Sequence, residues 1–156
     1  MASKGNETLL NKGILKKDAF IVIVKTEWNA AIVDELEAGC IKIFEQYQIG
    51  YETITVPGAV EIPFAIKRSW KKSNELLQLP DAYIALGCVI QGDTPHFEYV
   101  CRSVTDGVLQ LNLTLPVPSI FGVLTVNTEQ QALERIGGIH GHKGEEAAIT
   151  ALKMLG

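Results

Sequence analysis

The sequence predicts a single α/β domain, a three-layer sandwich in which a four-stranded parallel sheet carries helices on both faces. Four apolar runs alternate with segments of helical period, which is the pattern of strands joined by crossover helices. The first and third runs are continuously apolar, as in strands that are covered on both faces. The 156 residues, 47% of them hydrophobic and 21% charged, are enough for one core and leave no room for a second domain.

Residues 1–17 are expected to form a flexible N-terminal arm ahead of a domain that spans residues 18–156. They are polar and show no sustained period, and they lack the apolar core and cleavage site of a secretion signal. The formal net charge of −4 gives no basic field for nucleic acid. No stretch approaches the roughly 18 apolar residues of a membrane span. We therefore expect a soluble, cytoplasmic protein that binds neither nucleic acid nor membranes.

The three cysteines are Cys40, Cys88 and Cys101, and each lies within an apolar pattern. They lack the close pairing of a zinc site or a disulfide framework. The sequence therefore predicts buried, free thiols in a reducing compartment.

The first strand is predicted at residues 19–24, a run rich in β-branched residues. A helix follows, with Asn29 as its N-cap and Gly50 as its end. This arrangement leaves Trp28 in the loop above the strand. An indole at that place is either a lid over the sheet edge or a platform for a planar ligand.

Residues 51–56 alternate between apolar and polar side chains, as in a half-exposed strand at the edge of a sheet. A turn then leads into a helix that tolerates Pro63 near its start. Glu61 lies close to the N-terminus of this helix, at the level of Trp28. Its carboxylate is either a partner of the helix dipole or an acceptor for N–H and hydroxyl groups of a ligand.

The central feature is the third predicted strand, 82–90, with the loop and helix that follow it. In an open parallel sheet, ligands bind at the carboxyl ends of the strands, and a following helix offers unpaired N–H groups to an anion. His96 stands at this junction, where an imidazole can exchange protons with a ligand near neutral pH. A helix-cap or surface role is the alternative for a lone histidine.

A fourth strand is predicted at 119–125, followed by a glycine-rich turn and a last helix that begins at Lys143. The small residues of that helix predict close packing against a sheet or another subunit. We find no G-x-G-x-x-G after the first strand, no P-loop, no H-E-x-x-H and no G-x-S-x-G elbow. The candidate site therefore consists of strand-end residues without a cofactor or metal motif: Trp28, Glu61, His96, Arg135 and Lys143.

Several motifs occur in order between residue 19 and the C-terminus. They are PGAVEIP at 57–63, GCVIQGDTPHF at 87–97 with Tyr99-Val100, FGVLT at 121–125, Gln131-Ala132 with Arg135, and Lys143-Gly144 with Glu146-Ala147-Ala148. Together they closely resemble the lumazine synthase family of riboflavin biosynthesis. The resemblance covers nearly the whole chain, so coincidence is a poor explanation.

The resemblance implies a flavodoxin-like fold and the condensation of two small-molecule substrates, 5-amino-6-(D-ribitylamino)uracil and 3,4-dihydroxy-2-butanone 4-phosphate. The product is 6,7-dimethyl-8-ribityllumazine, formed in the penultimate step of riboflavin biosynthesis with release of phosphate and water. No cofactor and no metal takes part. The family forms homopentamers with active sites at the subunit interfaces, and some members assemble into a shell of about 60 subunits.

The resemblance also assigns roles by position. His96 matches the proton-transfer residue, and Lys143 matches a nearby basic residue of the catalytic group. Residues that match the pyrimidine and ribityl walls are Trp28, Ala59, Val60, Glu61, Cys88, Val89, Ile90 and Phe121. Residues that match the phosphate site are Asp93, Thr94 and Arg135. Val60 stands where phenylalanine is frequent in the family, and Gln130 where glutamate is frequent.

Two other functions remain open from the residues. One is an archaeal-type riboflavin synthase, which binds two lumazines and no phosphate. The other is a non-catalytic flavin- or lumazine-binding module on the same fold. The joint presence of His96, Arg135 and Lys143 favours the condensing enzyme, because a pure binder needs no proton shuttle together with a phosphate group.

Overall fold

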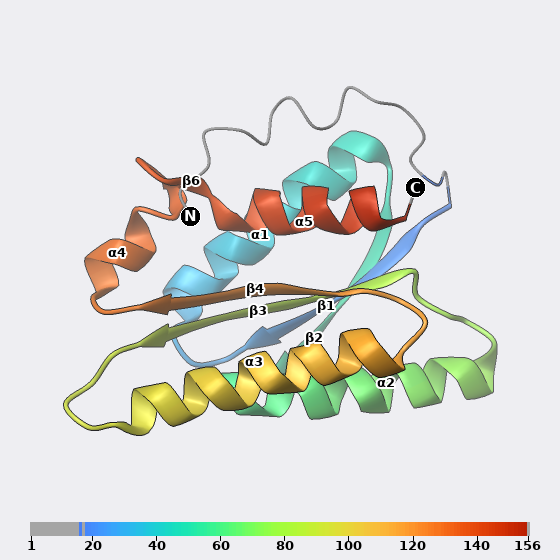
Figure 1. The fold of residues 1–156 in the computed structure, drawn as a ribbon. Coiled ribbons are helices and arrows are strands. Elements are labelled where there is room, and N and C mark those ends of the chain that lie inside the picture. The colour runs from blue at the N-terminus through green and yellow to red at the C-terminus, as the bar shows by residue number, and fades with distance from the viewer. Residues whose placement is uncertain (1–15, 17, 156) are drawn as a thin grey trace.

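The computed structural model describes residue 16 and residues 18–155, so the predicted arm lies almost wholly outside the described residues. The main sheet has four parallel strands in the order β2-β1-β3-β4 (Figure 1). These strands are β1 (Phe20–Thr26), β2 (Gly50–Val56), β3 (Ala82–Ile90) and β4 (Ser119–Val126). The predicted four-stranded parallel sheet is confirmed, and so is the edge position of its second strand.

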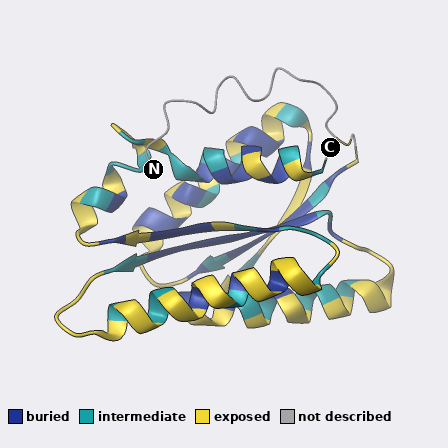
Figure 2. Ribbon diagram, in the orientation of Figure 1, coloured by how far each residue is buried: buried dark blue, intermediate teal, exposed yellow. Residues whose placement is uncertain are grey.

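Helices cover both faces of the sheet (Figure 1). One layer contains α1 (Ala30–Tyr47) and α5 (Lys143–Met154); the other contains the short 3₁₀ helix η2 (Ala59–Glu61), α2 (Ile62–Leu76) and α3 (His96–Thr114). Alternate residues of β1 enter the two cores, with Ile21 and Ile23 on the α1 side and Val22 and Val24 on the α2 side. Figure 2 shows that burial is concentrated in the sheet and on the helix faces turned toward it. The predicted three-layer sandwich is therefore confirmed.

A small hairpin follows β4 and the short helix α4 (Glu129–Leu133). Its strands β5 (Ile136–Gly138) and β6 (Gly141–His142) pair in antiparallel fashion, where the sequence predicted only a glycine-rich turn. Strands of this length are too short to show an alternating pattern. At the base of the hairpin the N–H of Lys143 donates to the carbonyl of Arg135 over 2.8 Å. The hairpin thus brings these two basic residues together.

The small-residue face of α5 packs closely on α1 of the same chain. A Cβ added at Gly144 would lie 2.0 Å from the carbonyl oxygen of Leu36, so only glycine allows this approach. Ala148 and Ala151 on the same helix are fully buried. The predicted close packing is confirmed, but the closest partner is helix α1 of the same chain, whereas the prediction named a sheet or another subunit.

Both ends of α1 differ in detail from the prediction. The helix ends at Tyr47 rather than at Gly50, because the chain must turn in time to bury Ile49 in the core. Gln48 takes the left-handed conformation at this turn (φ 56°). At the other end Asn29 does precede the helix, but its side chain makes no capping hydrogen bond.

All three cysteines are free thiols. Cys40 and Cys88 are buried as predicted, whereas Cys101 is only partly buried because it precedes the buried stripe of α3 that begins at Val104. Within the described residues, no helix combines the length and apolar character needed to cross a membrane.

Candidate functional site

A cavity of about 540 Å³ opens at the carboxyl ends of β1 and β3, on the sheet face that η2 and α3 cover. We call it the strand-end pocket. Most of the predicted site residues line it: Trp28, Ala59, Val60, Glu61, Cys88, Val89, Ile90, Thr94 and His96. A larger hollow of about 710 Å³ runs along β2 and α2 and shares Glu61 with the pocket, but it contains no predicted proton-transfer residue. We therefore place the site in the strand-end pocket.

The pocket arises because β3 extends further than its neighbour β1. Pairing between these strands ends at Lys25 and Leu86, whereas β3 continues beside β4 as far as Ile90. The last residues of β3 therefore have no paired strand on the β1 side. Val89 and Ile90 are only partly buried there, so both can contact a ligand.

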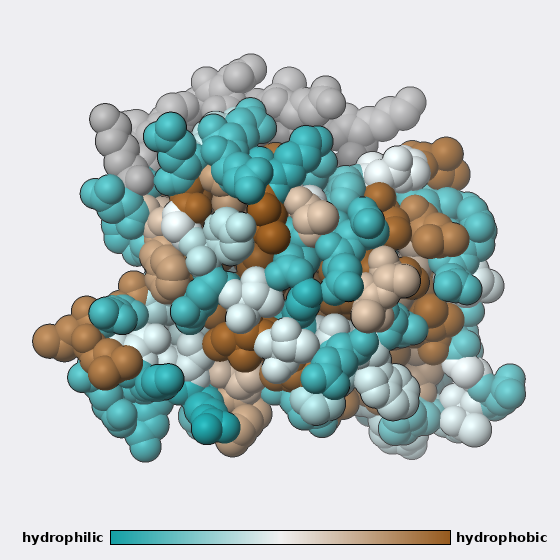
Figure 3. Space-filling view, turned by 180° about the vertical axis from the view of Figure 1, so that it is seen from behind, coloured by the Kyte–Doolittle hydropathy of each residue, from teal (hydrophilic) through white to brown (hydrophobic). Residues whose placement is uncertain are grey.

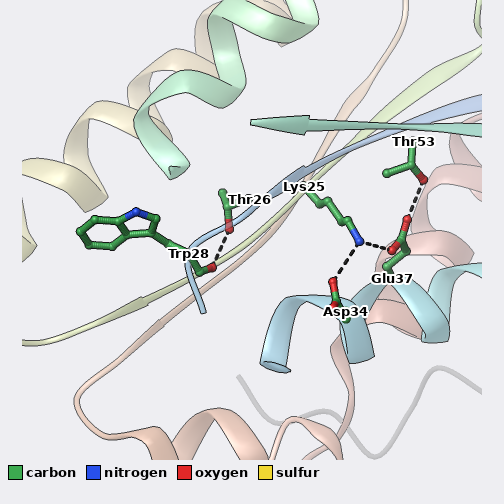
Figure 4. Close-up of polar contacts among 6 residues, drawn as sticks. All are labelled: Lys25, Thr26, Trp28, Asp34, Glu37 and Thr53. Carbon is green, nitrogen blue, oxygen red and sulfur yellow. Dashed lines mark hydrogen bonds and ion pairs between the residues drawn. The ribbon is translucent and has the colours of Figure 1, made fainter. Parts of the chain in front are cut away.

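The indole of Trp28 forms the outer wall of the pocket and is 74% exposed. Its backbone is held by two hydrogen bonds. The Thr26 hydroxyl donates to the Trp28 carbonyl over 3.1 Å (Figure 4). The Trp28 N–H donates to the carbonyl of Pro57 over 3.2 Å. An aromatic ring that is exposed on a fixed backbone is suited to stacking on a planar ligand. The platform interpretation of Trp28 is therefore favoured over the lid.

Glu61 precedes α2 and makes no side-chain hydrogen bond to the N-terminus of that helix. Its carboxylate lies against Gly58, with one oxygen 3.0 Å from the position that a Cβ would occupy there. Because its own helix does not use the carboxylate, Glu61 is available to accept hydrogen bonds from a ligand.

The start of α3 forms the end of the pocket that suits an anion. Gly92 and Thr94 line this end, and His96 is the first residue of the helix, which has 19 residues. Unpaired N–H groups and the positive end of the helix dipole favour negative charge there. Asp93 belongs to the same loop but does not line the pocket.

Cys88 lies on the inner wall of the pocket. Burial, with a smaller effect from the charge of Glu129, raises the pKa of its thiol to about 11. The thiol therefore stays protonated at neutral pH and is no nucleophile, and its side chain packs in the core on the α1 face, so the backbone of Cys88 borders the pocket. Within the described part of the chain, no three side chains of His, Cys, Asp or Glu gather in a way that could hold a metal ion.

An ionic cluster braces β1 from the opposite face of the sheet (Figure 4). The ammonium of Lys25 lies 2.5 Å from a carboxylate oxygen of Glu37 and 2.9 Å from one of Asp34, both on α1. Glu37 also accepts a hydrogen bond from the hydroxyl of Thr53 on β2 over 2.6 Å. Burial lowers the pKa of Lys25, but the hydrogen bonds and charges of the two carboxylates outweigh burial and raise it above its usual value. The cluster joins β1, β2 and α1 directly behind the strand-end pocket.

Phe121, Arg135 and Lys143 do not line the strand-end pocket. Phe121 is 40% exposed and pairs with Ala85, five residues before Ile90, so it lies about 16 Å from the end of β3 at roughly 3.3 Å per residue. Arg135 directly precedes β5 and Lys143 is the first residue of α5, a helix that packs on the other face of the sheet. In one chain, the predicted site residues therefore form two separate groups.

The two basic residues of the second group have partners within the chain. A guanidinium N–H of Arg135 donates to the carbonyl of Gln131 over 2.7 Å. The ammonium of Lys143 pairs with the carboxylate of Glu146 at 2.8 Å. Both side chains are partly buried, so their positions are fixed by the chain itself.

Asn29 is a pocket residue that sequence reasoning assigned only to a helix cap. It lines the strand-end pocket, and its side-chain amide donates to the carbonyl of Cys88 over 2.7 Å. Asparagine before a helix usually caps it, so no feature of the sequence distinguishes this second use.

Comparison with known proteins identifies relatives over most of the chain. A family model described as 6,7-dimethyl-8-ribityllumazine synthase matches residues 18–156. Relatives named 6,7-dimethyl-8-ribityllumazine synthase share 47% identity with the chain in each of three organisms. The match covers 86% of this chain and 83% of the relative in Parabacteroides distasonis, 85% and 92% in Bacteroides fragilis, and 90% and 86% in Porphyromonas gingivalis.

Proposed function

The chain belongs to the 6,7-dimethyl-8-ribityllumazine synthase family, and we propose that it is a transferase that catalyses the reaction of this family in riboflavin biosynthesis. The enzyme joins 5-amino-6-(D-ribitylamino)uracil to 3,4-dihydroxy-2-butanone 4-phosphate and releases phosphate and water. The observation that carries this proposal is the strand-end pocket. It combines an exposed indole, a carboxylate that its own helix does not use and a histidine at a helix N-terminus.

The pyrimidine substrate fits the part of the pocket between Trp28 and the end of β3. Its flat ring stacks on the indole, while Val89 and Ile90 form the facing wall. Ala59, Val60 and Glu61 lie beside this slot and contact the ribityl chain. The Glu61 carboxylate accepts hydrogen bonds from ribityl hydroxyl groups.

The phosphate-bearing substrate occupies the part of the pocket at the start of α3. Backbone N–H groups of the loop at Asp93 and Thr94 and the helix dipole favour its phosphate there. A phosphate monoester carries a charge of about −1.5 to −2, yet the residues that line the pocket include no lysine or arginine. One chain therefore leaves the phosphate without a cationic partner.

We propose that a neighbouring subunit supplies this partner. Arg135 is the cationic residue among those that match the family's phosphate site, and it does not line its own pocket. Its guanidinium suits bidentate binding of phosphate oxygens. Phe121 and Lys143 would enter the neighbour's pocket with Arg135 and complete the pyrimidine wall and the catalytic group.

A closed head-to-tail ring satisfies such sharing for every subunit, because each chain completes the pocket of the next. Phe121 is exposed on the open edge strand β4, and Tyr51 and Phe64 are exposed on β2 and α2 at the other side of the molecule. Figure 3 shows that the side seen from behind carries hydrophobic patches among polar ones. We propose the family's pentamer, of about 85 kDa for five chains of 17.0 kDa, with a 60-subunit shell of about 1 MDa as its further assembly.

His96 carries the protons of the reaction. Formation of the imine requires a proton taken from the attacking amine and one given to the departing water. Elimination of phosphate then requires a proton removed from carbon, and closure of the ring releases a second water. One imidazole can serve these steps in turn. Holding both substrates in one pocket supplies much of the remaining acceleration.

The test is to mix the purified protein with both substrates and to follow lumazine absorbance and phosphate release together. We expect one phosphate for each lumazine, with no loss of activity in the presence of a chelator. Riboflavin formed from lumazine alone would point to an archaeal-type riboflavin synthase. Binding of lumazine without any turnover would point to a non-catalytic module. We place the enzyme in the cytoplasm, because all three of its thiols are free.

A further inference from the structure

Asn29 connects the loop that carries Trp28 to the opposite wall of the strand-end pocket. Its backbone is left-handed (φ 57°, ψ 40°), and its carbonyl accepts the first hydrogen bonds of α1, from the N–H groups of Ile32 at 2.9 Å and Val33 at 3.0 Å. Its side chain does not cap the helix. Instead, the side-chain amide donates to the carbonyl of Cys88 over 2.7 Å, across 59 positions of sequence.

The Cys88 carbonyl lies where β3 has lost its neighbour. Pairing of β3 with β1 ends at Leu86, so the end of β3 has no strand partner on the pocket side. The amide of Asn29 takes the place of the missing strand. A carbonyl group left without a donor there would be unsatisfied when a ligand displaces the surrounding water.

Trp28 depends mainly on its backbone for its position, because 74% of the residue is exposed. On one side, the loop is held by hydrogen bonds from Glu27 N–H to the Val56 carbonyl at 2.8 Å and from Trp28 N–H to the Pro57 carbonyl at 3.2 Å. The bond from Asn29 to Cys88 holds the loop on the other side. The loop that carries the indole is therefore hydrogen-bonded to both walls of the pocket.

We propose that Asn29 is a positioning residue that sets the width of the slot between the Trp28 indole and the end of β3, and thereby the affinity for the planar ring of the pyrimidine substrate. This inference rests on the proposed function, because it assigns the slot to that substrate. Asparagine suits this task for two reasons. It tolerates the left-handed backbone that the turn requires, and its amide supplies a donor, which neither glycine nor aspartate can offer at this position.

Two substitutions remove the donor and keep the backbone conformation accessible. Asn29→Asp preserves the shape of the side chain and suits the N-terminus of α1, so the fold should tolerate it. Asn29→Gly removes the side chain altogether. Gln48→Gly is the matched control, because Gln48 has the same left-handed conformation at the other end of α1, far from the pocket.

The first measurement needs no substrate. In a Trp70→Phe background, the tryptophan fluorescence comes from Trp28 alone. We expect both Asn29 variants to lower the fluorescence anisotropy of this indole and Gln48→Gly to leave it unchanged. Unchanged anisotropy in both Asn29 variants would overturn the inference.

The second measurement separates positioning from a general structural role. Asn29→Asp should raise the KM for the pyrimidine by about tenfold and change the KM for the phosphate-bearing substrate by less than about twofold. In a Trp28→Ala background, the same substitution should change the pyrimidine KM by less than about twofold, because the two residues act through one contact. Equal effects on both substrates, or an effect that persists without the indole, would overturn the inference. Loss of anisotropy in a protein that forms no lumazine even as wild type would instead contradict the proposed function alone.

Discussion

The strand-end pocket and the group formed by Phe121, Arg135 and Lys143 both consist of residues that the sequence assigned to the site. They differ in the types of side chain they contain and in whether those side chains line a cavity. In the pocket, three segments distant in sequence meet around one cavity, with aromatic, acidic and imidazole side chains but no lysine or arginine. The second group has two cations and an exposed phenylalanine but does not line that cavity. The pocket lacks the cation that the second group has, and the second group lacks the cavity.

This difference is the basis of our proposal that one chain holds half of a site. A dianionic substrate needs a cation, and a pocket on the surface of a small sheet needs a further wall. Arg135 and Phe121 match these two needs in chemistry but not in position. Since both belong to segments that are held in the fold by β4 and by the packing of α5 on α1, we propose that the two regions meet between subunits.

Loss of the phosphate cation should have the largest effect. Removing a bidentate contact costs on the order of 2–3 kcal/mol, so Arg135→Ala should raise the KM for the phosphate-bearing substrate by about 30- to 150-fold. Steady-state kinetics with each substrate varied in turn measure this change. Arg102→Ala, on the exposed side of α3, serves as the control. A defect confined to the pyrimidine would place Arg135 in the wrong half of the site.

Loss of His96, the proposed proton carrier of the pocket, should have the second largest effect. His96→Ala should lower kcat by about tenfold or more and leave both KM values nearly unchanged, because the pocket still holds the two substrates together. His96→Gln should lower kcat equally, since an amide can form hydrogen bonds but cannot carry the proton. Wild-type turnover in either variant would show that His96 has only a helix-cap or surface role.

Trp28 tests the pocket wall. Trp28→Ala should weaken binding of the pyrimidine by about tenfold, because stacking of a base on an aromatic ring contributes roughly 1–3 kcal/mol. Titration calorimetry with the pyrimidine measures this change. Trp70→Phe on α2, outside the pocket, should leave the affinity as it is. Equal affinity in the two variants would show that the indole is a lid and not a platform.

The ionic cluster behind the pocket should affect stability rather than chemistry. Lys25→Met leaves Glu37 and Asp34 without their cation and should lower the free energy of unfolding by about 1–2 kcal/mol. Urea unfolding at fixed protein concentration measures this loss. Lys42→Met is the matched control, and it should cost less than about 0.5 kcal/mol because Lys42 pairs with Glu145 while 68% exposed.

The pH dependence of this contribution has a defined sign. The pKa of Lys25 is raised in the folded protein above its ordinary value of 10.5. The folded state therefore binds the proton more tightly, and the stabilisation is fully present below that value and disappears as the pH rises through the raised pKa. The stability difference between wild type and Lys25→Met should be constant from neutral pH to about pH 9. A difference that shrinks over that interval would contradict the assigned role of the cluster.

The sequence predicted the sheet and the strand-end pocket well, because both depend on local patterns. The apolar run that ends at Ile90 predicted β3 to the residue, and the junction at His96 predicted the start of α3. The hairpin after α4 was not predicted, since its strands are too short to show a period. The use of the Asn29 amide was also missed, because the carbonyl that it binds becomes free only where β1 ends beside the longer β3.

The sequence also failed to predict that Arg135 lies away from the pocket, because this separation depends on tertiary contacts. A pattern along the chain shows which residues stand near strand ends, but not on which face of the sheet each following element packs. That choice depends on the close contact of Gly144 with α1, which is a tertiary contact and leaves no period in the sequence.

Subunit mixing tests the shared site most directly. His96→Ala has a defective pocket and an intact second group, and Arg135→Ala has the reverse. When the two variants are co-expressed in equal amounts, about a quarter of the interfaces in a head-to-tail ring join two intact halves, so activity should recover to about a quarter of the wild-type value. A chain that carries both substitutions, mixed with either single variant, should recover none. If activity of the co-expressed pair stays at the sum of the two variants measured alone, each site lies within one chain and the shared-site proposal is contradicted.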